Sequence, residues 1–90
     1  MSGADVRRVG VVGLGTMGAG IAQVVAASGR EVVLHDSAPG AIERGLATIE
    51  RSLARLHEKG GPAPEAVLAR ITRAEEPVPA DLMIEAIVED

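Results

Sequence analysis

The feature that most constrains the fold of this sequence is a glycine-rich turn between two apolar segments. Its glycines follow the pattern G-x-G-x-x-G over Gly13-Leu14-Gly15-Thr16-Met17-Gly18. The β-branched run at 9–12 before the turn is typical of a strand buried in a parallel sheet. Residues 17–28 after it are small or apolar at helical spacings, and Gly29 supplies a stop. The sequence therefore predicts a strand, a tight turn and a buried helix.

The rest of the chain continues this alternation of strands and helices. Residues 31–35 predict a second strand, which completes a βαβ unit with a right-handed crossover. A second helix is predicted with Ser37 as its N-cap and Pro39 in its first turn, and it ends at Gly60-Gly61-Pro62. Its apolar stripe, which we expect to face the sheet, is Ile42, Leu46, Ile49, Leu53 and Leu56. Its opposite, solvated face is predicted to carry Glu43, Arg44, Glu50, Arg51, Arg55 and Glu58.

The last third of the chain predicts a helical turn at 64–70, a brief strand at 71–74, a loop at 75–79 and a strand at 82–88. The fold class is therefore α/β, a partial Rossmann-like doubly wound parallel sheet with one βαβ unit, a long helix and one or two further strands. A complete dinucleotide domain has two such halves. We expect residues 1–90 to be the N-terminal part of one, as the front of a longer protein.

Each glycine of the turn has a physical role in binding a dinucleotide. Gly13 permits the tight turn, Gly15 lets a pyrophosphate approach the backbone, and Gly18 lets helix and strand pack closely. The N–H groups at the start of the following helix then face the phosphates. The pattern predicts a cofactor-binding segment over residues 13–18.

An acid stands where the adenosine ribose of a dinucleotide is recognised. Asp36 directly follows the second predicted strand, within a few residues of the expected spacing of about 20 from the glycines. Its carboxylate would accept hydrogen bonds from the ribose hydroxyls and would repel a 2′-phosphate. Because no Arg or Lys follows it closely in the sequence, NAD is favoured over NADP. The alternative is a purely structural turn with Asp36 as a helix cap.

Composition excludes several other classes of function. The 90 residues contain no Cys, Trp, Tyr or Phe and have a net charge of −4. Disulfides and thiolate metal sites are therefore excluded, and nucleic acid is a poor partner. No signal peptide or membrane span is visible, so we expect a cytoplasmic protein that does not bind membranes.

The segment from Val11 to Gln23 resembles the N-terminal fingerprint of the L-3-hydroxyacyl-CoA dehydrogenases, including 3-hydroxybutyryl-CoA dehydrogenase. Further matches are 32–36, 49–53 and 84–89. That family oxidises the 3-hydroxyl of an acyl-CoA and passes hydride to NAD. The resemblance implies that Glu89 lies near the nicotinamide and that Ser52 and Lys59 contact CoA, whereas a lone Ser and Lys on a helix are usually only solvated.

The same resemblance places the catalytic His and Glu pair beyond residue 90, with a helical domain that covers the substrate and forms a dimer. We therefore expect no turnover by this chain alone. His35 and His57 are the only histidines, and we expect both to be packed or solvated rather than catalytic. Glu85 lies in an apolar strand, so we expect it to face a crevice or, preferably, to pair with a basic group.

Two alternatives remain open. The turn at 13–18 also resembles the start of the β-hydroxyacid and 6-phosphogluconate dehydrogenases, although that group usually has Met-Ala and Asn where this chain has Ile21-Ala22-Gln23. A stand-alone dinucleotide-binding module without catalysis is the third interpretation.

Overall fold

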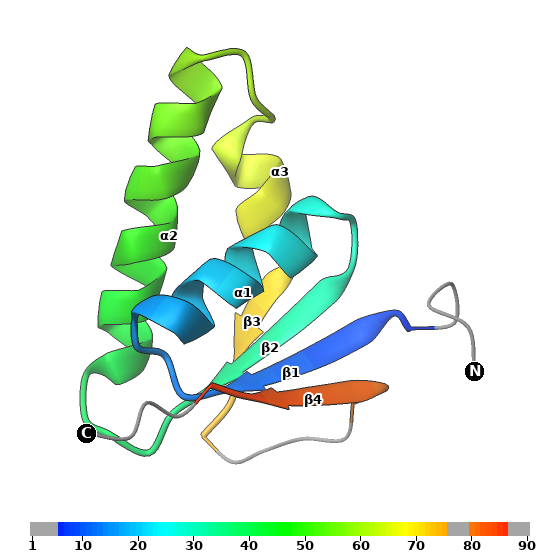
Figure 1. Ribbon diagram of the computed structural model, residues 1–90, viewed down its shortest axis with the longest axis vertical. Helices are drawn as coiled ribbons and strands as arrows, with labels where there is room; N and C mark the ends of the chain where they lie inside the picture. The colour runs from blue at the N-terminus through cyan, green and yellow to red at the C-terminus, as the bar shows by residue number, and fades with distance from the viewer. Residues whose placement is uncertain (1–5, 76–79, 87–90) are drawn as a thin grey trace.

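The computed structural model describes residues 6–75 and 80–86, which form a parallel sheet covered by helices (Figure 1). The elements are β1 (Arg8–Val12), α1 (Thr16–Ala27), β2 (Glu31–His35), α2 (Ala41–Glu58), α3 (Pro64–Leu68), β3 (Ile71–Arg73) and β4 (Leu82–Glu85). All four strands run parallel, and their order is β3-β2-β1-β4. The predicted α/β class with its βαβ unit is confirmed.

The direction of winding reverses beside β1. The chain steps outward from β1 to β2 and then to β3, and β4 returns to the opposite side of β1. β1 is therefore paired on both sides, with Val11 opposite Leu34 on one strand and Ile84 on the other. Loops after two adjacent strands diverge at such a reversal and leave a crevice at the carboxyl end of the sheet.

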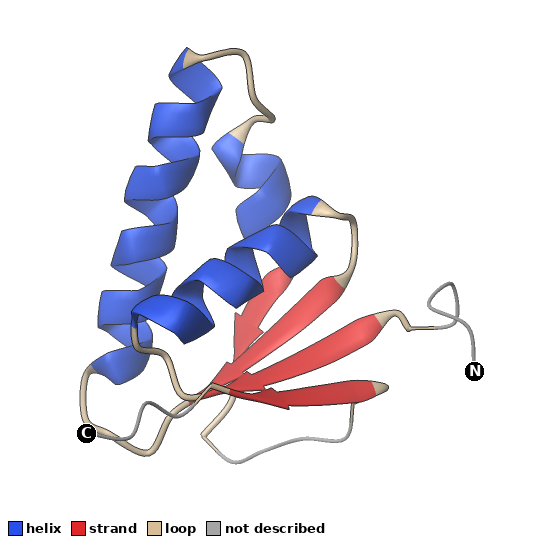
Figure 2. Ribbon diagram, in the orientation of Figure 1, coloured by secondary structure: helices blue, strands red, loops and turns tan. Residues whose placement is uncertain are grey.

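The helices cover one face of the sheet (Figure 2). Alternate strand residues point to that face, and they are almost fully buried: Val9, Val11, Val32 and Leu34. Helix α1 lies directly on β1 and β2, with small residues at the contact. Because alanine and glycine carry little or no side chain, α1 can approach the sheet closely, which explains the composition of this helix.

Helix α2 belongs to the same core but packs differently from the prediction. Its stripe turns inward at Ile49 and Leu53, which are buried, whereas Leu56 is 45% exposed. The main packing partners of α2 are α1 and α3, while Ile49 and Leu53 also belong to the buried cluster that contains the inward-facing strand residues. Hydrophobic spacing identifies a buried face but not the element that covers it.

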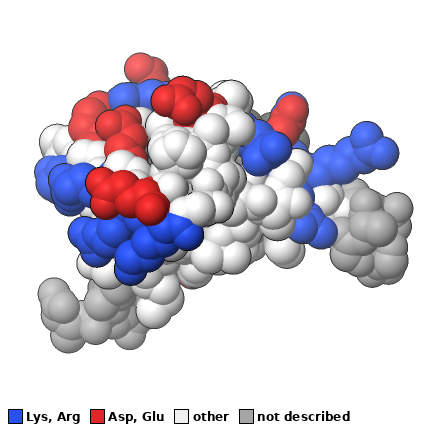
Figure 3. All heavy atoms as spheres, turned by 90° about the horizontal axis from the view of Figure 1, so that it is seen from above, with Lys and Arg blue, Asp and Glu red and all other residues white. Residues whose placement is uncertain are grey.

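Charged residues of both signs lie on the side of the molecule that carries α2 (Figure 3).

The start of α2 also differs from the prediction. Ser37 is not the N-cap and Pro39 is not in the first turn, because α2 begins at Ala41 after Gly40, whose φ is 75°. The Asp36 carboxylate accepts the N–H of Ala38 at 2.8 Å and so closes a turn around Ser37. Local side-chain bonding by an aspartate competes here with helix formation.

Within the described residues, the last strand ends earlier than the predicted strand at 82–88. β4 ends at Glu85, and Ala86 is buried but lies outside the strand. Residues 87 and 88 of the predicted strand lie outside the described residues. Within 6–75 and 80–86, no helix has the length and apolar character needed to cross a membrane.

Candidate functional site

The turn that leaves β1 can be built only with glycine at two positions. Gly13 has a φ of 91°, a left-handed conformation that side chains disfavour, and its N–H donates to the carbonyl of His35 at 2.9 Å. A Cβ on Gly18 would lie 1.9 Å from the Gly13 carbonyl oxygen. The predicted roles of these glycines in the tight turn and the close helix contact agree with this geometry.

The first turn of α1 presents unsatisfied backbone donors. Gly15 is its N-cap and supplies no side-chain cap, and no acidic side chain lies in the first turn. The N–H of Ala19 donates to the Gly15 carbonyl at 3.0 Å, which is the first hydrogen bond of the helix. The N–H groups of Thr16, Met17 and Gly18 come before it and have no acceptor within the helix. A Cβ on Gly15 would meet nothing within 4 Å. This open, positive helix end suits a pyrophosphate.

Leu14 connects the turn to two other elements. Its side chain is buried, and it lies so close to α2 that a Cβ on Gly45 would be 3.2 Å from the Leu14 Cβ. Its N–H donates to Oδ2 of Asp36 at 2.7 Å. The glycine turn is therefore held by packing against α2 and by the hydrogen bond that it donates to the residue after β2.

Asp36 is held by two backbone donors, Leu14 through Oδ2 and Ala38 through Oδ1. These hydrogen bonds, the one from Leu14 first, hold the pKa of the Asp36 carboxyl below its usual range. Each carboxylate oxygen can accept more than one hydrogen bond, so both retain capacity for ribose hydroxyls. The carboxylate stands charged and oriented at neutral pH.

A groove of about 330 Å³ joins the glycine turn to Asp36. Val12, Gly13, Leu14 and Gly15 line one part of it, His35, Asp36 and Ser37 line another, and Ala86 reaches it from beyond β4. The N–H of Ala86 donates to the Val12 carbonyl at 2.8 Å. The groove thus combines N–H groups without acceptors, a glycine that leaves room for a phosphate, and an oriented carboxylate. This combination, at the point where the winding reverses, fits a pyrophosphate and an adenosine.

The two residues predicted to contact CoA, Ser52 and Lys59, do not line this groove. Ser52 is half-buried within α2, and Lys59 is exposed just beyond the end of that helix. An 18-residue helix is about 27 Å long, and α2 begins beside Asp36, so Lys59 lies far from the glycine turn (Figure 1). Glu89 lies outside the described residues.

Both histidines bond to backbone oxygens. His35 Nδ1 lies 3.1 Å from the carbonyl of Ala74, and His57 Nδ1 lies 3.1 Å from that of Gly61. Glu85 is exposed, and within the described part of the chain no basic group pairs with it, so the expected pairing is wrong. Exposure removes the desolvation cost on which that expectation depended.

Sequence reasoning missed two arginines near Asp36. Arg44 in the first turn of α2 contributes to lowering the Asp36 pKa, after the stronger backbone hydrogen bonds. Arg73, at the end of β3, forms an ion pair with Glu43 of α2. Neither follows Asp36 closely in the sequence, and only the pairing of β3 with β2 could have indicated Arg73.

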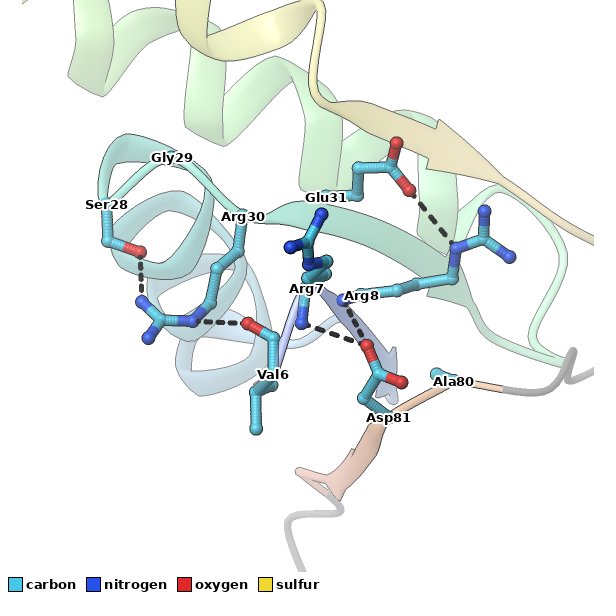
Figure 4. A pocket seen from close by; sticks show the side chains of 9 residues that line it. All are labelled: Val6, Arg7, Arg8, Ser28, Gly29, Arg30, Glu31, Ala80 and Asp81. Atoms are coloured by element: carbon cyan, nitrogen blue, oxygen red, sulfur yellow. Dashed lines mark hydrogen bonds and ion pairs between the residues drawn. The ribbon is translucent and has the colours of Figure 1, made fainter. Parts of the chain in front are cut away.

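A larger hollow, about 820 Å³, lies at the opposite, amino end of the sheet (Figure 4). Asp81 Oδ2 there accepts the N–H groups of Arg7 and Arg8, each at 2.9 Å. Arg30 donates to the Val6 carbonyl and to Ser28 Oγ, each at 3.0 Å. These polar groups form hydrogen bonds with one another, and the glycine turn lies at the opposite end of the sheet. This hollow is therefore not the dinucleotide site.

The sheet order and the groove at its carboxyl end define a dinucleotide-binding α/β domain. The family described as "3-hydroxyacyl-CoA dehydrogenase, NAD binding domain" matches residues 8–90, and the chain belongs to this family. The recognition made from the fingerprint is confirmed, as is the cofactor NAD.

Individual relatives agree with the family. A probable 3-hydroxybutyryl-CoA dehydrogenase of Deinococcus radiodurans is 50% identical over 88 residues, which are 92% of this chain and 32% of that protein. The 3-hydroxybutyryl-CoA dehydrogenase of Bradyrhizobium diazoefficiens is 42% identical over 92 residues, or 96% of this chain and 31% of that protein. The crystal structure of (S)-3-hydroxybutyryl-CoA dehydrogenase from Ralstonia eutropha superimposes with a TM-score of 0.85 at 38% identity, covering 96% of this chain and 32% of that one. The chain thus spans about a third of the length of these relatives.

Proposed function

We propose that this chain is the NAD-binding part of an enzyme that oxidises the 3-hydroxyl of an L-3-hydroxyacyl-CoA to a ketone. NAD, when bound, supplies the hydride acceptor for that oxidation. The observation that carries the proposal is the Asp36 carboxylate held beside the open N-terminus of α1. The names of the relatives supply the substrate class.

The proposed binding roles follow from the geometry of the groove. The backbone of residues 13–18 binds the pyrophosphate, with Gly15 allowing the close approach and the N–H groups of the first turn of α1 donating. Asp36 accepts the adenosine ribose hydroxyls with the lone pairs that Leu14 and Ala38 leave free. We propose Glu89 for the nicotinamide end by family resemblance.

A titration with NADH and NADPH tests the cofactor site. Ligand-observed NMR is suitable because the chain has no Trp or Tyr for fluorescence. We expect NADH to bind more tightly than NADPH, and Asp36→Ala to lose this preference, because the ribose hydroxyls lose their acceptor. Asp81→Ala is the matched control, since its carboxylate also accepts two backbone N–H groups but at the other end of the sheet. An absence of NADH binding by the folded chain would refute the proposal.

Ser52 and Lys59 are proposed to contact the CoA part of the substrate. Seven positions separate them, about two helical turns, so both lie on one side of the carboxyl end of α2. The ammonium of Lys59 is exposed and can meet a CoA phosphate. We expect Lys59→Ala to weaken CoA binding severalfold in a calorimetric titration, with Arg55→Ala on the same helix as the control. Equal losses in both variants would indicate only general charge attraction.

The remaining proposals concern the whole enzyme. Residues 1–90 form the N-terminal part of its NAD-binding domain, and the catalytic His and Glu pair belongs to sequence beyond residue 90. The enzyme is proposed to be a cytoplasmic dimer. A mixture of this chain, NAD and L-3-hydroxybutyryl-CoA should therefore produce no NADH. Measurable turnover would contradict the proposal that the catalytic pair lies beyond residue 90.

A further inference from the structure

A second groove, about 530 Å³, lies beside Asp36 at the carboxyl end of β2 and β3. Its charged lining consists of Asp36 after β2, Glu43 from α2, and Arg73 and Glu75 from the end of β3 and beyond. β3 brings Arg73 there by pairing with Leu34 of β2, two residues before Asp36. The groove therefore places a guanidinium on the ribose side of the site, where none was expected.

Each nearby guanidinium already has a partner within the chain. Arg73 Nη2 is paired with Oε1 of Glu43. Arg44 donates from Nη1 to the Pro39 carbonyl at 3.3 Å, within the loop that leads into α2. The carboxylates of Asp36, Glu43 and Glu75 outnumber the one arginine in the lining, so the groove is negative overall.

NADP differs from NAD by a phosphate on the 2′ position of the adenosine ribose, where Asp36 is proposed to accept hydroxyls. Proteins that accept this phosphate present an arginine to it. We propose that Glu43 adds to the preference for NAD that Asp36 sets in this chain, because its ion pair with Arg73 competes with a 2′-phosphate for the guanidinium. This inference rests on the proposed dinucleotide function and assigns a specificity role to the Glu43–Arg73 pair.

The exposure of the pair indicates that it has little structural role. The Arg73 and Glu43 side chains are 54% and 57% exposed, and ion pairs at such exposure contribute little to folding stability. The hydrogen bond from Arg73 holds the pKa of Glu43 below its usual range, so the pair is fully charged at neutral pH. Glu43 can therefore be changed without unfolding the chain.

The test is the ratio of the dissociation constants for NADPH and NADH, measured by ligand-observed NMR on four proteins. These are the wild-type chain, Glu43→Gln, Glu50→Gln and the double variant Glu43→Gln/Arg73→Gln. We expect Glu43→Gln to shift the ratio about five- to tenfold toward NADPH, because Arg73 becomes available for a charge-assisted bond. Glu50→Gln makes the same change in net charge two turns along α2, and we expect it to leave the ratio nearly unchanged. The double variant should return the ratio to the wild-type value.

The phosphorus NMR signal of the NADPH 2′-phosphate gives a second readout. It should shift on binding to Glu43→Gln and lose that shift in the double variant. An unchanged ratio in Glu43→Gln, or an equal change in Glu50→Gln, would overturn the specificity role while leaving the NAD site intact. A wild-type chain that is folded by circular dichroism but does not bind NADH would overturn the proposed function and this inference with it.

Discussion

Two aspartates at opposite ends of one sheet have nearly the same chemistry and different surroundings. Asp36 at the carboxyl end accepts two backbone N–H groups at 2.7 and 2.8 Å, and Asp81 at the amino end accepts two at 2.9 Å. In both cases these backbone hydrogen bonds lower the pKa of the carboxyl. The charge state of the carboxylate therefore cannot distinguish a binding residue from a structural one.

The neighbours of each aspartate make the distinction. Around Asp81, the arginines donate to backbone, hydroxyl and carboxylate oxygens of the chain itself, as with Arg8 and Glu31 at 3.2 Å. Around Asp36, the first turn of α1 leaves N–H groups without intrahelical acceptors, and Gly15 leaves open space above them. A binding site is indicated where polar groups lack partners within the chain.

The largest expected effect concerns the glycine contact that shapes the carboxyl end. Gly18→Ala would place a Cβ 1.9 Å from the Gly13 carbonyl oxygen, so α1 must move away from the turn. We expect a loss of about 3 kcal/mol in the free energy of unfolding, measured by urea denaturation. Gly20→Ala is the control on the same helix, because a Cβ there meets nothing within 4 Å, and it should be neutral or stabilising. Similar results for both variants would contradict the close contact.

The second effect separates binding from stability at the two aspartates. Asp36→Asn and Asp81→Asn both remove a charge and keep the shape of the side chain. We expect Asp36→Asn to weaken NADH binding about tenfold, since a charged acceptor of the ribose hydroxyls is lost. Asp81→Asn should lower the melting temperature and leave the NADH dissociation constant unchanged. If Asp81→Asn weakened NADH binding as much, the two ends of the sheet would be coupled and the comparison would fail.

The smallest expected effect is a decline in folding stability at low pH to which both aspartates contribute. Because both carboxyls have a pKa in the folded chain below that of the unfolded chain, their stabilising contribution is present at neutral pH and is lost as pH falls below about 4. We expect the wild-type melting temperature to decline in that range and each Asn variant to show a shallower decline. Only Asp36→Asn should also flatten the loss of NAD binding over the same range. An identical pH profile in all three proteins would remove both aspartates from the acid response.

The sequence predicted the parts of this molecule that depend on local pattern. The alternation of strands and helices and the tight turn at Gly13 follow from residue type and spacing, and the structure confirms both. The acid at Asp36 also follows from its spacing, and the structure has its carboxylate bonded to this turn at the end of β2. The pairing of β4 with β1 does not follow from the hydrophobic pattern, and among the predictions only the doubly wound fold class implies it. The approach of Arg73 to the groove beside Asp36 depends on that same order through β2 and β3.

Competition between local interactions explains the other differences. Ser37 has the chemistry of a helix cap, but Asp36 closes the turn first by bonding to Ala38, and α2 starts later. The apolar stripe of α2 was recognised correctly as a buried face, yet α1 and α3 rather than the sheet receive most of it. These outcomes depend on which partner forms the better contact in three dimensions.

The double pairing of β1 has a consequence for how the chain folds. One neighbour of β1, β2, follows it in the sequence after a single helix, whereas the other, β4, is the last strand. The hydrogen bond from the Arg7 N–H to Asp81 beside β4 therefore spans 74 positions. Contacts of such sequence separation require closure of a long loop before they contribute stability, which slows folding. During synthesis, the βαβ unit can form early while one edge of β1 stays open. The groove proposed for the dinucleotide is therefore complete only once Ala86, directly after β4, bonds to the carboxyl end of β1.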